Sequence, residues 1–477
     1  MPAEPITLER LATVAGGKVV GNAAIRIGDV THDSRAAGPS DLFVAIRGAN
    51  RDGHEFVMTT AAGAACVDTV VTVDLPQLVV PDTRAALSTL AAAVHGHPSR
   101  HLKVVGITGT NGKTTVAHLL ASIVSAAGDI PGVVGTVGAR IGDQHLNQER
   151  TSPEASDFQR LLRRMVDNGV TVAAVEVSSH ALVFGRTAAT DFATVAFTNL
   201  SQDHLDLHGD MENYFQAKAA LFSGSGSTSV INVDDEWGRR LADEISGRLI
   251  AVGSNGALRA DQIDPAIFHT SFDLVTPQGA RRITLPLGGL FNVENALIAA
   301  GCALSLGFDL EIIAAGLEAV EVIPGRMEAV QAGQACAIIV DYAHTPAGIQ
   351  QVLASVQPLV PGRVIVVVGA GGDRDADKRP AMGRAAAQAD IAYITSDNPR
   401  SEDPAAIIRD VASGADGAGI VVTQPDRRLA IAAAISDADP SDAVLILGKG
   451  HELGQEVAGK VEPFDDRQVA REAVAAL

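Results

Sequence analysis

The run from Gly106 to Thr115, which reads Gly-Ile-Thr-Gly-Thr-Asn-Gly-Lys-Thr-Thr, constrains this chain most because it joins two elements of opposite type. The apolar run from Leu102 to Ile107 predicts a buried strand, and the apolar stripe after the loop predicts a helix that opens at Thr114 and stops at Gly128. Unpaired N–H groups at a helix N-terminus attract phosphate, and glycines let the backbone approach it. Lys113 can then reach the β and γ oxygens, and Thr114 can ligate magnesium. The run therefore predicts a site for a nucleoside triphosphate.

The glycine spacing of this loop differs from that of the common P-loop, which would place a glycine where Ile107 stands. The simpler alternative is a glycine-rich turn without a ligand. Gly-Lys-Thr-Thr between a strand and a helix is far more specific for phosphate than an isolated Gly-x-Gly, so we predict a variant P-loop. The nucleotide contacts expected from the loop are Gly109, Thr110, Asn111, Gly112, Lys113, Thr114 and Thr115.

Composition limits the classes of protein to consider. A chain of 477 residues with 47% hydrophobic and 19% charged residues is long enough for about three globular domains. The net charge of −19 argues against non-specific nucleic-acid binding, so a polyanionic ligand would need clustered basic groups. The N-terminus lacks a basic segment followed by an apolar run, and we expect a cytoplasmic protein without membrane insertion. Cys66, Cys302 and Cys336 show no C-x-x-C spacing and are expected to be reduced core thiols.

Apolar strand candidates alternate with alanine-rich helical stretches, which predicts an α/β chain with mostly parallel sheets. Beyond the P-loop strand, these candidates are 170–177, 192–197, 229–233, 337–340, 363–368, 391–395 and 443–447. Pro98 and the segment 323–326 mark two boundaries, so we expect domains at 1–99, 100–326 and 327–477.

Polar residues follow the strand candidates, at the sheet edge where ligands gather in such folds. Glu176 ends a fully apolar strand and is expected to complete magnesium coordination opposite the loop hydroxyl, the alternative being a carboxylate facing water. The next strand is followed by Asp203, His204, Asp206 and His208, which could ligate a metal or form a hydrogen-bonded loop.

Lys218 lies at the centre of an apolar helical stripe formed by Met211, Tyr214, Phe215, Leu221 and Phe222. Burying an unpaired ammonium costs several kcal/mol. Either the side chain extends to solvent or its amine has a special partner, and helical periodicity leaves both open.

Four polar segments follow strand candidates in the last third of the chain: 341–346, 369–375, 396–400 and 448–452. Each could be a surface turn, but together they predict a site for a small ligand with carboxylate and ammonium groups. Arg374 and Arg400 have the forked geometry for carboxylates, and Glu452 could hold an amine.

These motifs, in this order, resemble the Mur ligase family over nearly the whole chain. The matching segments are 33–35 with 41–45, the P-loop, 151–153, 176–180, 203–206, 214–218, 292–295, 325–328, 341–346, 397–400 and 448–452. The resemblance implies three domains: a smaller N-terminal α/β domain for UDP, a central P-loop domain with a mostly parallel sheet for ATP, and a C-terminal Rossmann-like domain for an amino acid. These would close on binding.

The resemblance implies an ATP-dependent amide ligase of peptidoglycan precursor synthesis, and hence a role in cell-wall biogenesis, cell shape and division. It would join meso-diaminopimelate to UDP-N-acetylmuramoyl-L-alanyl-D-glutamate through an acyl phosphate, forming ADP and phosphate, with ATP and Mg²⁺ as cofactors and as a monomer. Alternatives are a lysine-adding ligase, folylpolyglutamate synthetase and a non-catalytic nucleotide-binding regulator. Asp397 to Arg400 argues against the first two, and Glu176, His204 and Lys218 argue against the third.

The resemblance also assigns residues. Positions matching contacts to the UDP part of the substrate are His32, Ser34, Ala49, Asn50 and Arg51. Positions matching contacts to its muramoyl dipeptide are Thr151, Ser152, Ser178 and Arg186. Positions matching further ATP contacts are Asn295, Arg326, Asp341 and His344. Positions matching the amino-acid contacts are Arg374, Asp397, Asn398, Pro399, Arg400, Gly448 and Glu452.

Lys218 matches the family's carbamylated lysine, which would bind magnesium with Thr114, Glu176 and His204 and act beside Lys113 in catalysis. Two positions depart from the pattern. Ser152 stands where many members have threonine, and Phe184 replaces a polar residue at one dipeptide contact, which puts that contact in doubt.

Overall fold

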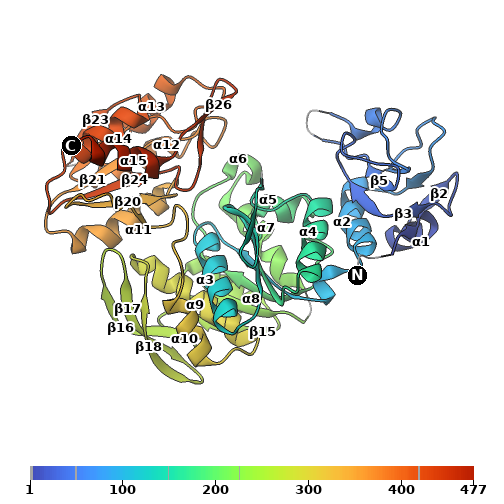
Figure 1. Ribbon diagram of the computed structural model, residues 1–477, viewed down its shortest axis with the longest axis horizontal. Helices are drawn as coiled ribbons and strands as arrows, with labels where there is room; N and C mark the ends of the chain where they lie inside the picture. The colour runs from blue at the N-terminus through green and yellow to red at the C-terminus, as the bar shows by residue number, and fades with distance from the viewer. Residues whose placement is uncertain (1–3, 49–50, 149, 225, 417–418) are drawn as a thin grey trace.

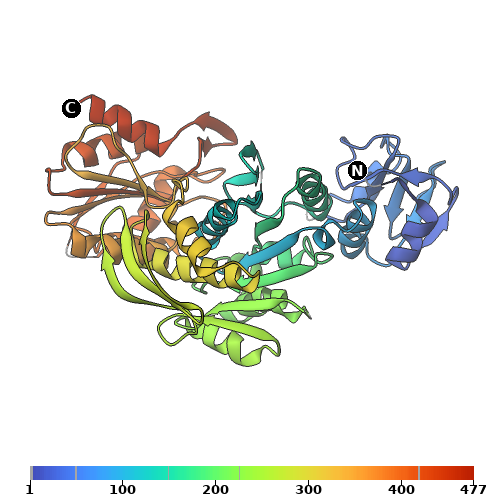
Figure 2. The ribbon, with the colours of Figure 1, turned by 60° about the horizontal axis from the view of Figure 1, so that its bottom comes forward.

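The structure is a computed structural model that describes residues 4–48, 51–148, 150–224, 226–416 and 419–477. Three α/β bodies follow one another along the molecule, with the N-terminal body at one end and the C-terminal body at the other (Figure 1). A second view shows the same order (Figure 2). Most neighbouring strands in the three large sheets are parallel, which confirms the predicted fold class.

The N-terminal body is built on a five-stranded sheet of order β2-β7-β6-β5-β4 in which only β2 runs antiparallel to its neighbour. The strands are β2 (Lys18–Val20), β4 (Asp29–Thr31), β5 (Asp41–Val44), β6 (Ala64–Val67) and β7 (Gln77–Val79). A small ribbon pairs β1 (Ile6–Thr7) with β3 (Arg26–Ile27). Leu8 and Leu11 of α1 (Leu8–Ala15) and Leu87 and Leu90 of α2 (Thr83–Val94) pack into its core.

The central body contains an eight-stranded sheet of order β11-β10-β9-β12-β8-β13-β14-β15, parallel from β9 to β15. The strands are β8 (Lys103–Thr108), β9 (Pro131–Gly135), β10 (Gly138–Ile141), β11 (Gln144–Leu146), β12 (Val172–Glu176), β13 (Phe192–Phe197), β14 (Thr228–Asn232) and β15 (Arg248–Val252). One face packs against α3 (Lys113–Ala126), α9 (Leu290–Ser305) and α10 (Leu310–Glu318). The other packs against α4 (Ala155–Asp167), α7 (Met211–Ala219) and α8 (Glu236–Glu244). Two short helices, α5 (Ser179–Val183) and α6 (Leu205–His208), follow strand ends.

A three-stranded antiparallel sheet of the central body does not appear among the strand candidates. It consists of β16 (Arg259–Pro265), β17 (Thr270–Thr276) and β18 (Gly279–Leu285). Side chains along β17 alternate between buried and half-buried, and Phe272 and Leu274 join the core under α9 and α10. This period of two is the pattern of a strand with one covered face, and it was available in the sequence.

The C-terminal body has a six-stranded sheet of order β19-β20-β24-β21-β22-β23, parallel except at β19. The strands are β19 (Glu328–Ala329), β20 (Ala337–Asp341), β21 (Val364–Val368), β22 (Ile391–Ile394), β23 (Ile420–Thr423) and β24 (Ala443–Leu447), followed by a hairpin of β25 (Gly454–Val457) and β26 (Lys460–Pro463). One core contains residues of α11 (Pro346–Val356), α12 (Arg379–Ala386) and α13 (Pro404–Ala412). The core on the opposite face contains residues of α14 (Arg427–Ser436) and α15 (Asp466–Ala475).

The predicted strands coincide with observed ones to within two residues at either end. In the described part of the chain, no helix is long and apolar enough to cross a membrane. Cys66, Cys302 and Cys336 are free and buried, as expected.

Candidate functional site

The P-loop occupies the turn between β8 and α3, as predicted. Gly109 and Gly112 have φ angles of +144° and +85°, in the region that favours glycine. A Cβ atom would lie 1.8 Å from Thr198 Oγ1 at Gly109 and 2.2 Å from Asn295 Oδ1 at Gly112. Ile107, by contrast, is fully buried in β8, so the missing glycine of the common motif falls in the core strand and not in the loop.

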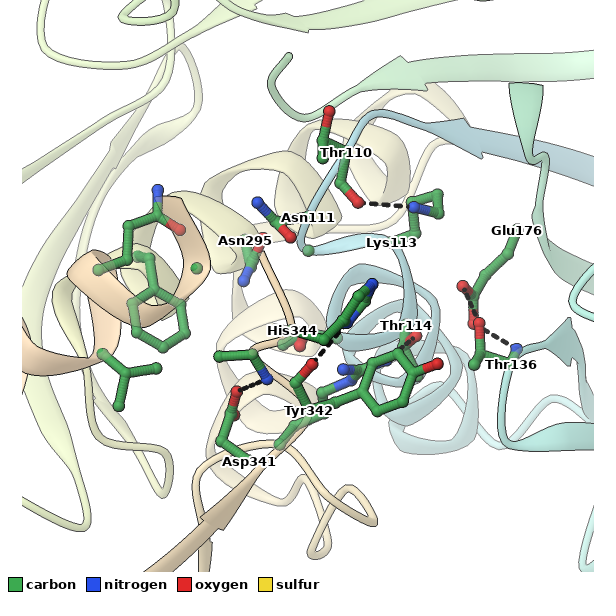
Figure 3. Close-up of a pocket in the computed structure, with 18 residues that line it drawn as sticks. Thr110, Asn111, Lys113, Thr114, Thr136, Glu176, Asn295, Asp341, Tyr342 and His344 are labelled. Carbon is green, nitrogen blue, oxygen red and sulfur yellow. Dashed lines mark hydrogen bonds between the residues drawn. The ribbon is translucent and has the colours of Figure 1, made fainter. Parts of the chain in front are cut away.

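Lys113 folds back onto the loop. Its Nζ donates to the carbonyl oxygen of Gly109 at 2.9 Å. It also donates to the carbonyl oxygen of Thr110 at 2.8 Å (Figure 3). Burial lowers the pKa of Lys113, and the negative charge of Glu176 partly offsets this. The ammonium is thus hydrogen-bonded to neutral carbonyl groups near a helix N-terminus. This is a position where phosphate groups bind in proteins.

A cavity lies between the P-loop and the C-terminal body. Its lining includes residues 110–115, Glu176 and Asn295 of the central body, together with Arg326, Asp341 and His344. Figure 3 shows Asn295 and His344 beside the P-loop residues. Every predicted ATP contact except Gly109 therefore lines one cavity. Arg326 also bridges the two sides directly, because its Nη2 donates to Thr114 Oγ1 at 2.8 Å.

Some residues of this cavity were not predicted from the sequence. Thr136 follows the end of β9, at the same sheet edge as Glu176, so its position at a strand tip was a usable signal. Tyr342 lies under the Arg326 guanidinium, 4.6 Å from the ring centroid, and Phe291 and Val352 supply apolar surface. Asp341 is buried, which raises the pKa of its carboxyl although Arg326 acts in the opposite direction.

Glu176 does not face water. Its side chain is fully buried at the end of β12, where Oε1 accepts a hydrogen bond from Thr136 N at 2.9 Å and Oε2 from Thr136 Oγ1 at 3.0 Å. Ile107 of β8 is its register partner, which brings the carboxylate to the edge where the loop begins. Thr114 and Glu176 thus offer hydroxyl and carboxylate oxygens to one cavity, the kind of ligand that Mg²⁺ prefers.

Lys218 is buried in α7 with 1% of its surface exposed, so its side chain does not extend to solvent. Its Nζ donates to the Gly109 carbonyl at 2.8 Å and lies 4.7 Å from the centroid of the Tyr214 ring. Burial, and next the charge of Lys113, hold the pKa of Lys218 well below its usual value. Two lysine amines therefore share the carbonyl oxygen of Gly109.

The residues of the motif at 203–208 differ in their burial and in their hydrogen-bond partners. Asp203 is buried and accepts from Lys378 Nζ of the C-terminal body at 3.1 Å. Burial would raise the pKa of Asp203, but His204, Lys378 and His344 outweigh it and hold that pKa below its usual range. Asp206 is exposed, and His208 Nε2 lies 3.0 Å from Ser179 Oγ.

His204 is half-buried and has a positive φ of +57°. Burial lowers the pKa of its ring to about 3, so it is neutral near pH 7 and able to ligate a metal. Neither His204 nor Lys218 lines the cavity that contains Glu176. Among the described residues, no group of three or more His, Cys, Asp or Glu side chains could hold a metal ion.

A polar cluster beside Glu176 contains the predicted dipeptide contacts. Ser152 Oγ donates to Glu176 O at 2.8 Å and accepts from Ser178 N at 3.1 Å. Arg186 Nη1 donates to Ser152 O at 3.2 Å, and Thr151 Oγ1 lies 3.1 Å from Thr136 Oγ1. The hydroxyl group retained at Ser152 is thus hydrogen-bonded to the backbone at the end of β12.

Phe184 packs between two arginines, with its ring centroid 5.2 Å from Arg84 Cζ and 5.6 Å from Arg186 Cζ. Both arginines also face Glu154, whose carboxylate lies 3.6 Å from Arg84 and 2.9 Å from Arg186. The aromatic ring of Phe184 therefore makes a cation–π contact with Arg186. Arg84 and Glu154 carried no signal in the sequence reasoning.

The predicted UDP contacts lie on the N-terminal body. His32 Nδ1 lies 3.0 Å from Ser156 Oγ of α4, Ser34 is half-buried and Arg51 is exposed. Ala49 and Asn50 lie outside the described residues.

The predicted amino-acid contacts meet at the carboxyl edge of the C-terminal sheet. Asn398 Nδ2 donates to Glu452 Oε2 at 2.7 Å, and a Cβ on Gly448 would lie 2.7 Å from Asp397 Oδ2. Arg400 Nη1 donates to Gly372 O at 2.6 Å.

Two further predicted contacts lie close to this group. The exposed Arg374 and the half-buried Arg400 both approach Gly371, where a Cβ atom would lie 4.0 Å from Arg374 Cγ and 3.0 Å from Arg400 Nη1. The carbonyl of Pro399 packs against Gly372.

Comparison with known proteins agrees with this geometry. The Mur ligase middle domain matches residues 107–303, and the Mur ligase glutamate ligase domain matches residues 325–450. A Streptomyces coelicolor protein named UDP-N-acetylmuramoyl-L-alanyl-D-glutamate--2,6-diaminopimelate ligase is 45% identical, covering 96% of this chain and 94% of its own. A solved structure of a ligase of that name superposes with a TM-score of 0.70 at 30% identity, covering 99% of both chains. Mycobacterium tuberculosis folylpolyglutamate synthase, complexed with ADP and AMPPCP, shares the fold at a TM-score of 0.63 and 21% identity, covering 82% of this chain and 94% of its own.

Proposed function

Because this chain belongs to the Mur ligase family, we propose that it is an ATP-dependent ligase that adds meso-2,6-diaminopimelate to UDP-N-acetylmuramoyl-L-alanyl-D-glutamate. The observation that carries the proposal is the cavity between the P-loop and the C-terminal body. One wall can hold a triphosphate, and the body that forms the other wall carries the cluster around Asn398, Arg400 and Glu452. ATP and an amino acid can therefore bind near each other, where the central and C-terminal bodies adjoin.

A carboxylate is a poor electrophile, so it must be activated before an amine can attack it. We propose that the acceptor carboxylate attacks the γ-phosphorus of ATP, which forms an acyl phosphate and releases ADP. The amine then attacks the carbonyl carbon, a C–N bond forms, and inorganic phosphate leaves as the amine loses a proton. Lys113 and Arg326 both line the cavity and would stabilise charge on the transferring group.

Thr114 and Glu176 would hold Mg²⁺, because both line the cavity and offer oxygen atoms. The metal would neutralise charge on the phosphates. His204 and Lys218 are proposed as further contributors, the latter after carbamylation.

Carbamylation of Lys218 is supported by the crowding of two amines at Gly109 O. The lowered pKa of Lys218 favours its neutral amine, which attacks CO₂, forms an N–C bond and releases a proton. The product is an anion that attracts Lys113 instead of repelling it. In ¹³C-bicarbonate, NMR of the wild type is expected to show a carbamate carbon that Lys218→Ala lacks, and its absence from the wild type contradicts the modification.

The remaining assignments are proposals of the same kind. Residues 1–99 would bind the UDP part through His32, Ser34 and the segment 49–51, residues 100–326 would bind ATP, and residues 327–477 the amino acid. Thr151, Ser152, Ser178 and Arg186 would hold the muramoyl dipeptide, since they surround the Glu176 strand end. We propose that the enzyme acts as a monomer, which light scattering can test.

The decisive assay is phosphate release from ATP in the presence of UDP-muramoyl dipeptide, with meso-diaminopimelate, lysine or no amino acid. We expect fast release with meso-diaminopimelate only, because we propose that the Arg400 guanidinium binds the carboxylate that lysine lacks. Release that does not depend on the amino acid contradicts the assignment.

A further inference from the structure

Lys449 is a charged residue with no surface exposure, and it lies two residues after the end of β24. Its Nζ donates to Glu452 Oε2 at 2.8 Å, to Asn398 Oδ1 at 3.2 Å and to the Gly454 carbonyl at 2.7 Å. An ammonium has three N–H bonds, and these three acceptors can use all of them. A buried charge is tolerated when it is paired and hydrogen-bonded, and Glu452 supplies the opposite charge.

The ammonium fixes the orientation of the Asn398 amide. A lysine only donates, so the amide atom that faces it must be the oxygen. The backbone N–H of Glu456 donates to the same oxygen at 2.9 Å. The amide nitrogen is thereby turned toward Glu452 Oε2, 2.7 Å away, and Lys449, Asn398 and Glu452 form a closed triangle.

The third bond of Lys449 reaches the hairpin that holds Arg400. Gly454 is the first residue of β25. Further along this strand, Glu456 O accepts from Arg400 N at 3.0 Å, and beyond it Ala458 N donates to Arg400 O at 2.7 Å. Arg400 has a positive φ of +53°, a conformation that a residue with a side chain adopts only when its surroundings hold it.

We propose that Lys449 is the positioning residue of the amino-acid site. It fixes the Glu452 carboxylate and the Asn398 amide, and through Gly454 it holds the hairpin against Arg400. Lys449 does not touch the ligand, because it is buried, whereas the Glu452 side chain is 29% exposed. An ammonium group at Glu452 and a carboxylate at Arg400 would then be bound at a set separation. The inference rests on the proposed function.

The test is the steady-state kinetics of full-length Lys449→Met. We expect the KM for meso-diaminopimelate to rise about ten-fold or more, with the KM values for ATP and the UDP substrate within about two-fold of wild type. Asp442→Asn is the matched control, because Asp442 is 3% exposed and bonded to Arg363 N at 2.7 Å, at the opposite end of β24. The control is expected to lower the melting temperature and to leave the KM for the amino acid unchanged.

Two further variants separate the possible outcomes. In a Glu452→Gln background, Lys449→Met is expected to add little to the KM, because both substitutions break one network. A folded Lys449→Met with an unchanged amino-acid KM overturns the inference. So does failure of both Lys449→Met and Lys449→Arg to fold, which would assign Lys449 to the core.

The amino acid that the wild-type enzyme ligates shows whether this inference or the proposed function is wrong. If it ligates lysine in place of meso-diaminopimelate, the function is wrong, but a selective rise in the KM for lysine still supports Lys449 as the positioning residue. If it ligates neither amino acid, both are wrong.

Discussion

The two joints of the molecule differ in how they relate to the nucleotide cavity. At the joint between the N-terminal and central bodies, Arg160 of α4 bonds Asp29 at 2.8 Å and Ser88 Oγ accepts from Ala189 N at 3.0 Å. None of these four residues is a proposed ligand contact, but His32, a proposed UDP contact, also lies at this joint, 3.0 Å from Ser156 Oγ of α4. At the joint between the central and C-terminal bodies, Asp203 bonds Lys378 at 3.1 Å and lies 3.9 Å from His344.

The second joint adjoins the nucleotide cavity, because His344 lines that cavity. Arg326 and Thr114, which both line this cavity, bond across the joint at 2.8 Å. Ligands that enter the cavity must replace or join these contacts. The first joint can persist through a catalytic cycle, and we infer that the second opens and closes with the ligands.

The largest expected effect comes from breaking the second joint with Asp203→Asn. Lys378 is 8% exposed, so the substitution leaves a buried ammonium without its opposite charge. We expect kcat to fall about a hundred-fold or more, and small-angle scattering to show an expanded molecule. Asp206→Asn, on the exposed neighbour, is the control. A compact Asp203→Asn enzyme with normal turnover contradicts the role given to this joint.

Arg400→Ala changes the proposed amino-acid site of the C-terminal body without changing the contacts of the second joint. It therefore separates amino-acid binding from closure of that joint. We expect the KM for meso-diaminopimelate to rise about ten-fold to a hundred-fold, because a bidentate charge-assisted contact is lost. Compaction by ATP in scattering should remain. If the KM values for ATP and the amino acid rise together, Arg400 acts on closure and the assignment is wrong.

Arg160→Met tests the first joint. The Arg160 and Asp29 side chains are 41% and 32% exposed, so solvent weakens the pair and we expect a loss of about 1 kcal/mol in the free energy of unfolding. Denaturant titration measures this loss. The KM for ATP is expected to stay at the wild-type value, and a clear rise in it would show that the two joints are coupled.

A further expected effect concerns the stability of the folded protein at acidic pH. Burial would raise the pKa of Asp29, but hydrogen bonds from His95 and Arg160 outweigh it and lower that pKa from 3.8 to about 2. A depressed pKa stabilises the folded state above the unfolded value, and this stability is lost as pH falls from about 4 to about 2. The difference in unfolding free energy between wild type and Asp29→Asn should shrink over that interval. A difference that grows there contradicts the assignment.

Parallel sheets explain why much of the site was predictable. In such a sheet all carboxyl ends meet at one edge, so strand-tip residues far apart in sequence become neighbours. Glu176 pairs in register with Ile107, and Phe197 pairs with Thr108, which gathers three predicted segments around the P-loop. Local apolar runs located these strands to within two residues.

The joints were not predictable, because they depend on how whole bodies pack. Lys378 stands in the charged run Asp375-Ala-Asp-Lys-Arg379, which reads as a solvated turn, yet it is 8% exposed. Lys449 lies between two glycines in a segment singled out for its neighbours Gly448 and Glu452. No local pattern shows that its amine closes a triangle with Asn398.

Isotope transfer tests the central claim, activation of a carboxylate by ATP, most directly. The UDP-muramoyl dipeptide would carry ¹⁸O in its acceptor carboxylate, and the phosphate released with meso-diaminopimelate would be analysed by mass spectrometry. An acyl phosphate retains one carboxylate oxygen in the P–O bond, so we predict one ¹⁸O in the phosphate for each peptide bond formed. Unlabelled phosphate, released at the same rate as the tripeptide product, would contradict the account.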